Sequence, residues 1–411
     1  HCSDNYLSIF QHLECMLFKK GELKELWPFY LYYLIYGFSS LIMPFMIIYF
    51  RDLSLTFFQI AVITSGFSIG MMLFEVPTGA FADGLSRKIS VIIGFLMNAA
   101  AILMFPFFNS PYVLFALWTF AGIGMSFISG AEEAWVVDNL HKAKKKELQQ
   151  EYFIKAASIV AFGAIFAPLL GALFVKSHPI KWLWLIFGAG FLINAIILSL
   201  FAKELYKPKR VSFLKSFKET FKNGAKGIKF TFNHKVILLL VLGGAFAILM
   251  ESASDGWQPL LVNFSMPKYG LGIIFSIVAA VSMVVPFLSR FLLKFKVKNA
   301  IAITLAFNML LLFSLIFLYP PMFMFAAIIF VFNNGIWYLN NPLLQSYFHK
   351  FIPTKIRATV ISTKSMFNKL AIILSSLAAG VLMDSFGPQK VIALGSLFGI
   401  FAIWCYLKIK D

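Results

Sequence analysis

A few charged side chains within long apolar stretches are the residues of this chain best placed to do chemistry. Glu251 and Asp255 stand four residues apart in one such stretch, and Lys369 lies in another. A charge at mid-membrane costs roughly 2.5–3.5 kcal/mol, so such residues are rare and tend to serve a function. On a continuous helix, the four-residue spacing would turn Glu251 and Asp255 toward one side, which we expect to be an aqueous cavity.

The depth of two of these charges suggests that they interact. Lys369 lies 14 residues beyond Lys355, and Glu251 lies 16 residues beyond Lys235. At helical rise these separations are roughly 21 Å and 24 Å, which would place the two charges at similar depth. We therefore predict that Lys369 and Glu251 form an ion pair or a proton-linked switch; the alternative is a static interior salt bridge.

Other polar residues of the apolar stretches are further candidates for lining a solute cavity. Of Glu132 and Glu133 we expect one to face the cavity mouth and the other to reach toward solvent, while Glu75, close to Pro77, belongs to a gate. Buried amides need hydrogen-bond partners, so an amide-rich face should line the cavity or join helices. That face comprises Asn333, Asn334, Asn340 and Asn341, with Trp337 and Tyr338 among them. Weaker candidates are Trp257, Gln258, Tyr32 and Tyr33.

The composition shows what must position these residues. Of 411 residues 60% are hydrophobic and 13% are charged, and Phe alone supplies 49. Soluble domains carry about 25% charged residues, so this chain could not cover itself with polar surface. The three cysteines have no metal-like spacing, and no phosphate-binding loop or catalytic triad is present. We expect neither an enzyme nor a cofactor or metal site, with a proton gradient as the energy source.

Twelve apolar stretches are long enough to cross a bilayer, which takes about 20 residues each. They run over roughly 28–50, 57–81, 89–108, 112–137, 152–175, 182–202, 236–257, 269–289, 299–318, 321–347, 358–383 and 389–407. The fold class is therefore an all-α integral membrane protein. We predict two six-helix bundles, 28–202 and 236–407, flanked by an N-terminal segment (1–27) and a tail (408–411).

The basic residues indicate how the helices are oriented. The net charge is +18, and with the N-terminus inside, 29 Lys and Arg fall on the inner side against 5 outside. By the positive-inside rule, both termini face the cytoplasm. Ten of the 29 lie in the 203–235 linker, where Phe213, Phe217 and Phe221 recur among lysines. This pattern predicts an amphipathic helix at the lipid surface. No nucleic-acid partner is needed to explain the charge.

The two halves align at a constant offset of 209 residues. At this offset Pro77 matches Pro286, Gly171 matches Gly380, and Lys155 matches Lys364. A shared offset supports an internal duplication, as expected of a transporter built from parallel halves.

The end of the second stretch carries the most specific motif. Gly79, Asp83, Arg87 and Lys88 resemble the signature loop between the second and third helices of the major facilitator superfamily, although Gly84 and Ser86 depart from it. The resemblance implies a cytoplasmic latch between the two halves, in which Asp83 caps the eleventh helix and Arg87 pairs with an acid ending the fourth. Asp138 occupies that place.

Further motifs extend this resemblance along the chain from about residue 28. The fifth stretch contains Gly163, Ala167, Pro168 and Gly171, followed by Ala172, which is similar to a degraded antiporter motif. A helix packed through small residues would explain the same pattern. Trp118 stands where the fourth-helix motif of the family carries Arg, which argues against its best-known proton-coupling arrangement. The segments around Glu75, Glu132, Trp257 and Gly380 also resemble the corresponding segments of many bacterial members of the family.

The sequence thus predicts a transporter of the inner or plasma membrane that works by alternating access. We expect proton-coupled export of a small, apolar or amphipathic solute by a monomer whose other partner is the bilayer. Proton-linked nutrient uptake or facilitated diffusion is the alternative within transport, and a non-transporting membrane sensor or scaffold is the alternative from another class. Residues 1–15 lack a starting Met, and we interpret them as an addition before a natural start at Met16; an amphipathic N-terminal extension is the alternative.

Overall fold

The computed structural model describes residues 18–205, 228–352 and 357–409, and within these it is built of helices. Twelve helical segments are long and apolar enough to cross a membrane, as the sequence predicts. Three predictions concern segments that lie wholly or partly outside the described residues: residues 1–15, the phenylalanines of the linker (Phe213, Phe217 and Phe221) and the tail.

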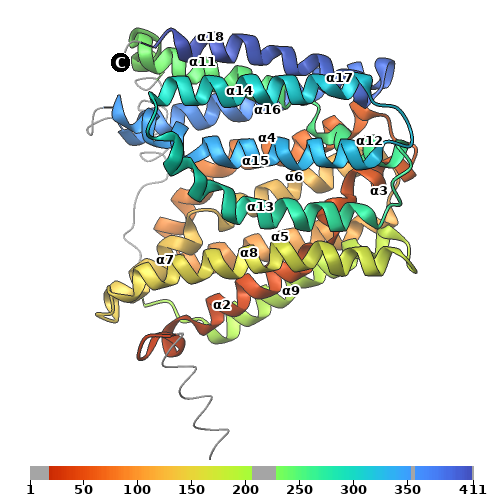
Figure 1. The fold of residues 1–411 in the computed structure, drawn as a ribbon. Coiled ribbons are helices and arrows are strands. Elements are labelled where there is room, and N and C mark those ends of the chain that lie inside the picture. The colour runs from red at the N-terminus through yellow and green to blue at the C-terminus, as the bar shows by residue number, and fades with distance from the viewer. Residues whose placement is uncertain (1–17, 206–227, 353–356, 410–411) are drawn as a thin grey trace, which may run out of the picture.

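In Figure 1 most helices of the second sequence half, coloured green to blue, lie above those of the first half, coloured red to yellow, although the two sets overlap in the middle of this view. The first half comprises α2 (Glu22–Ser39), α3 (Met46–Asp52), α4 (Phe57–Gly84), α5 (Arg87–Met104), α6 (Pro111–Ile128), α7 (Ala131–Lys142), α8 (Leu148–Val175) and α9 (Leu183–Phe201). The second half comprises α11 (Lys235–Met250), α12 (Trp257–Asn263), α13 (Gly270–Leu292), α14 (Val297–Phe313), α15 (Phe323–Lys350), α16 (Arg357–Phe386), α17 (Pro388–Gly395) and α18 (Gly399–Leu407).

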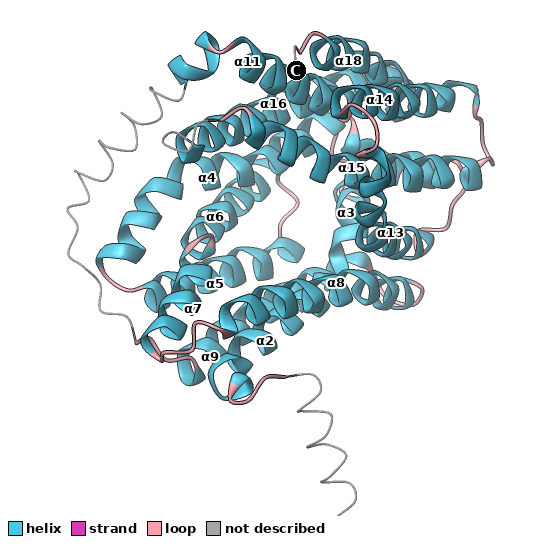
Figure 2. Ribbon diagram, turned by 60° about the vertical axis from the view of Figure 1, so that its left-hand side comes forward, coloured by secondary structure: helices cyan, strands magenta, loops and turns pink. Residues whose placement is uncertain are grey.

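The helices run back and forth between two ends of the molecule. We call the end that carries the start of α2 and the finish of α18 the terminus end, and the other the opposite end. Figure 2 is turned so that the terminus end comes forward. The two bundles meet along α4 with α16 and along α8 with α13.

Four of the apolar stretches are interrupted, which the apolar pattern does not predict. The twelfth passes through a 3-10 segment at Ser396–Phe398. The first passes through a 3-10 segment at Ser40–Phe45, and the fourth breaks at Gly130, whose φ is +75°. The seventh stops at Glu251 and resumes at Trp257. Ser, Asp and Gly are poor helix formers, and the sequence between these two residues consists of Ser, Ala, Asp and Gly.

The first helix also begins earlier than expected, at Glu22 rather than near residue 28. Glu22 is fully buried there and accepts hydrogen bonds from Lys155 Nζ (2.6 Å) and from the Tyr30 hydroxyl (2.7 Å). Apolar periodicity cannot reveal this extra turn, because its stability comes from a buried ion pair with a residue of α8.

Candidate functional site

The break in the seventh span places Glu251 at the end of α11, where three helices of the second bundle meet. Its carboxylate accepts hydrogen bonds from Asn308 Nδ2 of α14 at 3.2 Å and from Asn333 Nδ2 of α15 at 3.1 Å. Both asparagines are buried. A carboxylate in a membrane span is therefore held by neutral donors, and none of the described lysines or arginines bonds to it.

Asp255 faces away from this cluster and toward the first bundle. It lies in a 3-10 turn (Ser254–Gly256), and its Oδ2 accepts a hydrogen bond from Thr64 Oγ1 of α4 at 3.4 Å. The prediction that Glu251 and Asp255 share one helix face is wrong, because the helix ends between them. The interrupted segment instead connects the Glu251 cluster to the interface between the bundles.

Lys369 bonds to Glu75 instead of Glu251. Its Nζ lies 2.7 Å from Glu75 Oε2, and this contact joins α16 to α4 across the two bundles. The predicted pair between Lys369 and Glu251 is wrong in this structure, because depth along a helix does not fix which way a side chain turns. The gate position predicted for Glu75 agrees with its place between the bundles.

The Glu75–Lys369 pair should contribute a small but measurable coupling energy. The side chains are 56% and 24% exposed, and partly exposed pairs contribute about 0.2–1 kcal/mol. We expect Glu75→Gln and Lys369→Met to show non-additive losses of thermal stability, with a coupling energy within that range, when compared with the double variant. Strictly additive losses would mean that the two side chains do not interact in the membrane.

The two acids of the fourth span have different surroundings, as the sequence predicts in part. Glu132 is 4% exposed and accepts hydrogen bonds from the hydroxyls of Tyr33, at 2.9 Å, and of Tyr152. The two hydroxyls also lie 3.2 Å from each other. Glu133, by contrast, is exposed. Glu132 thus joins α2, α7 and α8 inside the first bundle rather than standing free in a cavity.

Removing one of these hydroxyls should destabilise the first bundle. A buried acceptor that loses a partner costs about 1–3 kcal/mol, and Tyr152 is fully buried against Glu132. We expect Tyr152→Phe to lower the free energy of unfolding by that amount, whereas the matched change Tyr112→Phe should have no effect because Tyr112 is 84% exposed. Thermal unfolding of purified protein checks this, and equal stability of the two variants would contradict it.

The asparagine-rich face of α15 divides between roles. Asn333 and Asn340 are buried and bond between helices, the latter by accepting from Thr304 Oγ1 at 2.7 Å. Asn334 donates to the carbonyl of Phe330 in its own helix, while Asn341 and Trp337 are exposed. Of the weaker candidates, Trp257, Gln258 and Tyr32 are buried and Tyr33 belongs to the Glu132 cluster.

The signature-loop residues meet only in part. Arg87 donates to Asp138 and to the carbonyl of Ala134, so the predicted pair is present. The Asp83 carboxylate lies 3.4 Å from Arg87 and its side chain is 60% exposed. The capping of the eleventh helix by Asp83 stays a prediction, because residues 353–356 lie outside the described chain. Apart from the neighbouring backbone of its own helix, no described atom lies within 4 Å of a Cβ built on Gly79.

A further acid at this loop escapes sequence reasoning. Glu204 Oε1 accepts from the backbone N–H of Arg87 at 2.7 Å, and Glu204 also bonds the Ser86 hydroxyl. A carboxylate at a helix N-terminus is favourable. In return, Lys88 Nζ bonds the carbonyls of Ser199 and Ala202 at the end of α9. Glu204 follows an apolar stretch at the start of a basic linker, where nothing marks it as a cap.

The small residues of α8 serve close packing on two sides. A Cβ on Gly163 would lie 2.6 Å from the Cα of Gly37, and one on Gly171 would lie 2.8 Å from the carbonyl oxygen of Leu41. The carbonyl oxygen of Pro168 approaches the second bundle, at 2.2 Å from a Cβ built on Gly272. Ala167 is fully buried. The packing interpretation of this motif is thus sufficient for its observed contacts.

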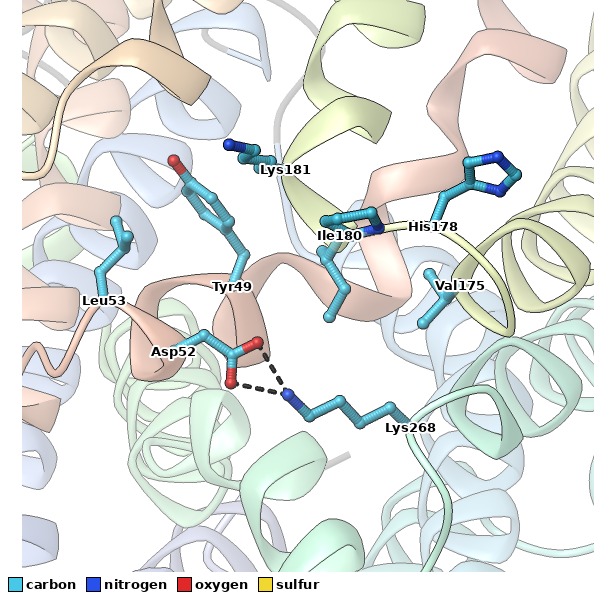
Figure 3. A pocket seen from close by; sticks show the side chains of 9 residues that line it. Tyr49, Asp52, Leu53, Val175, His178, Ile180, Lys181 and Lys268 are labelled. Atoms are coloured by element: carbon cyan, nitrogen blue, oxygen red, sulfur yellow. Dashed lines mark hydrogen bonds and ion pairs between the residues drawn. The ribbon is translucent and has the colours of Figure 1, made fainter.

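Polar contacts also hold the bundles together at the opposite end. Lys268 Nζ bonds both carboxylate oxygens of Asp52 at 2.7 and 2.8 Å, beside a hollow of about 320 Å³ that Tyr49, His178 and Lys181 help to line (Figure 3). The carboxylate of Asp384, in α16, accepts from the backbone N–H groups of Phe57 and Phe58 and so caps α4.

These contacts define one conformation. The bundles are joined from the opposite end as far as Lys369, near the middle of α16, and Glu75, in the last third of α4. Gly79 and Asp83 of the signature loop show no close contact with the described part of the second bundle. Such an arrangement joins the bundles at the opposite end and at the Glu75–Lys369 pair, while the start of the eleventh helix, which the latch would contact, lies partly outside the described residues.

Comparison with known proteins places these features in context. The profile of the Major Facilitator Superfamily matches residues 29–376. An uncharacterized MFS-type transporter of Bacillus subtilis, YxaM, is 26% identical over 90% of this chain and 92% of its own. The quinolone resistance protein NorA of Staphylococcus aureus is 22% identical over 86% and 88%. The crystal structure of the nucleoside transporter NupG superposes with a TM-score of 0.76, at 16% identity over 95% of this chain and 99% of that one.

Proposed function

Because the chain belongs to the major facilitator superfamily of secondary transporters, we propose that it exports a small apolar or amphipathic solute in exchange for protons. The observation that carries this proposal is the Glu251 cluster. It places a single carboxylate between three helices at a break in a membrane span, where a proton could be taken up or released. The break leads directly to Asp255 and its contact with the first bundle.

This connection gives protonation a route to the bundle interface. Neutralising Glu251 would change its bonds to Asn308 and Asn333, and hence the packing of α11 against α14 and α15. The residues after it, up to Gly256, contact α4 through Asp255 and Thr64. The interface therefore borders the site on which the proposed ion acts, as alternating access requires. Lys369 and Glu75 lie across the same interface and would exchange partners as the bundles rock.

Two further observations support export and its orientation. NorA and a second relative, multidrug resistance protein 1 of Bacillus subtilis at 24% identity, carry names that refer to drug resistance. In the topology predicted from the sequence, 29 of 36 basic residues fall on the side of the membrane that holds both termini, which supports a cytoplasmic location for that side. The described conformation would then open toward the cytoplasm, the side from which an exporter loads. We retain a monomer as the working unit.

Drug susceptibility separates export from uptake. Expression of the chain in a drug-sensitive bacterium should raise the concentration of a quinolone or another apolar drug that is needed to stop growth, and Glu251→Gln should remove the protection. A nutrient importer would leave susceptibility unchanged and would instead raise uptake of its solute. A sensor or scaffold would tolerate both Asp83→Asn and Glu251→Gln without any change in solute flux.

A further inference from the structure

Two buried amide oxygens beside Glu251 have no hydrogen-bond partner within the described chain. They are the Oδ1 atoms of Asn308 and Asn333, whose Nδ2 atoms both donate to the Glu251 carboxylate. The two residues are only 2% and 4% exposed. Buried polar atoms are nearly always paired, so two orphan acceptors at one carboxylate call for an explanation.

The electrostatics of the same place favour a cation. Glu251 caps the C-terminus of α11, where the helix dipole contributes about half a negative charge. A carboxylate there adds to that negative potential instead of offsetting it. After Glu251 the backbone hydrogen bonds span three residues, as in a 3-10 helix, instead of four as in an α-helix. Ser254 N donates to Glu251 O, and Gly256 N donates to Ala253 O. In other transporters, Na⁺ is coordinated where a membrane helix is interrupted.

We propose that Glu251, Asn308 and Asn333 form a binding site for a monovalent metal cation, Na⁺. A half turn of each amide group would aim its oxygen at the carboxylate and the ion, and would move its NH₂ group to the position in which the oxygen now has no partner. Carboxylate, amide and backbone oxygens are the ligands that hard cations prefer. One carboxylate balances a single positive charge, whereas sites for Ca²⁺ gather several acidic oxygens.

This inference deepens the proposed function, because it gives the proposed proton site a second ion. The carboxylate holds either a proton or Na⁺, and in both cases the negative charge at the end of α11 is neutralised. Asp255, which bonds Thr64 at the bundle interface, lies at the other end of the same break. Binding of Na⁺ is measured without transport, so the two proposals fail separately.

Thermal unfolding of the purified full-length chain in equal concentrations of NaCl, KCl or choline chloride tests the site. At about ten times its Kd, a bound ion should raise the melting temperature by about 2 °C in NaCl relative to choline chloride. KCl should have a smaller effect. Equal melting temperatures of the wild-type protein in NaCl and choline chloride would overturn the proposal.

Two variants of Asn308 and one control variant test the role of the amide oxygen. Asn308→Leu removes one ligand and should abolish the Na⁺-dependent shift, while Asn308→Asp keeps the oxygen and should retain or enlarge it. If Asn308 served only as an NH₂ donor to Glu251, the aspartate variant would lose Na⁺ dependence as the leucine variant does. Asn334→Ala is the matched control, because Asn334 bonds only within its own helix, and it should show the full shift.

Direct measurement of Na⁺ binding to the wild-type chain tests the proposal even if a variant does not fold. Wild-type protein should bind one radioactive sodium ion per chain, and Glu251→Gln should bind at least about tenfold less, a loss of about 1.4 kcal/mol. Binding that persists in Glu251→Gln would overturn the site. If the wild-type chain exports solute in a proton-driven way but does not bind Na⁺, the Na⁺ inference alone is overturned.

Discussion

Replacing Gly272 by valine is expected to drive the protein out of the conformation described here, whereas replacing Gly79 by valine should hold it there. A Cβ on Gly272 would lie 2.2 Å from the carbonyl oxygen of Pro168 and 2.8 Å from the Cβ of Ala172. Those atoms belong to the other bundle, so the contact at the opposite end must open. Overpacking costs about 1–3 kcal/mol, which shifts a two-state population by about fivefold to more than a hundredfold.

Gly79 should show the reverse behaviour because it is free in this conformation. A Cβ there meets no described atom within 4 Å apart from the neighbouring backbone of its own helix. If the signature loop closes against the second bundle in the alternative conformation, as the family resemblance implies, valine would obstruct that closure and leave the present state unaffected. Gly244→Val is the matched control, since Gly244 is equally free here but lies outside the loop.

Distances between paired spin labels measure both effects. One pair, at Ser54 and Ser265, spans the bundles at the opposite end, and another, at Lys142 and Lys294, spans them at the terminus end; all four residues are exposed. Gly272→Val should lengthen the first distance and shorten the second, while Gly79→Val should narrow both distributions around the values of the described conformation. Unchanged distributions in both variants would contradict a rocking movement of the bundles.

The second large effect is expected at Glu251. Glutamine has the same shape and can still accept from one asparagine NH₂ group, and it can donate to the other asparagine if that amide turns its oxygen toward it, but it can neither bind a proton nor carry a negative charge. We expect Glu251→Gln to slow transport driven by a pH gradient by at least about tenfold, equivalent to about 1.4 kcal/mol. Exchange of solute across the membrane without a gradient should persist, since it needs no net movement of protons.

Glu133→Gln provides the control for this change. Glu133 is also an acid of a membrane span, but its side chain is exposed rather than enclosed by neighbouring helices. The Glu133→Gln variant should keep nearly wild-type rates both of transport driven by a pH gradient and of solute exchange without one. Equal losses in the Glu133 and Glu251 variants would show that negative charge in the spans acts in general, and not through the cluster at the break.

The fold could be predicted from the sequence because apolar length and loop charge are summed over many residues. Twelve spans emerge from composition alone, and the signature loop identifies the family. The breaks were missed because Ser252, Ser254 and Gly256 are tolerated in many helices, and only tertiary contacts decide whether such a segment stays helical. The apolar pattern therefore predicts a continuous helix through Glu251, where the structure has a break.

The site was predicted as a set of residues but not as a set of contacts. Glu251, Asn333 and Lys369 stand out as polar groups in apolar surroundings, a signal that the sequence carries directly. Their partners do not, because Asn308 and Thr64 are single polar residues in otherwise ordinary spans. The similar depth of Lys369 and Glu251 along their helices predicts that they pair, but α16 is rotated so that Lys369 bonds to Glu75.

Proton movement in inverted membrane vesicles tests the central claim most directly. Vesicles containing the wild-type chain are acidified inside, and a quinolone or another apolar drug is added outside while a pH-sensitive dye is followed. We predict that the drug dissipates part of the gradient with the wild-type chain and does not with Glu251→Gln. A gradient that stays intact with the wild-type chain, while labelled drug still accumulates in the vesicles, would contradict proton-coupled export.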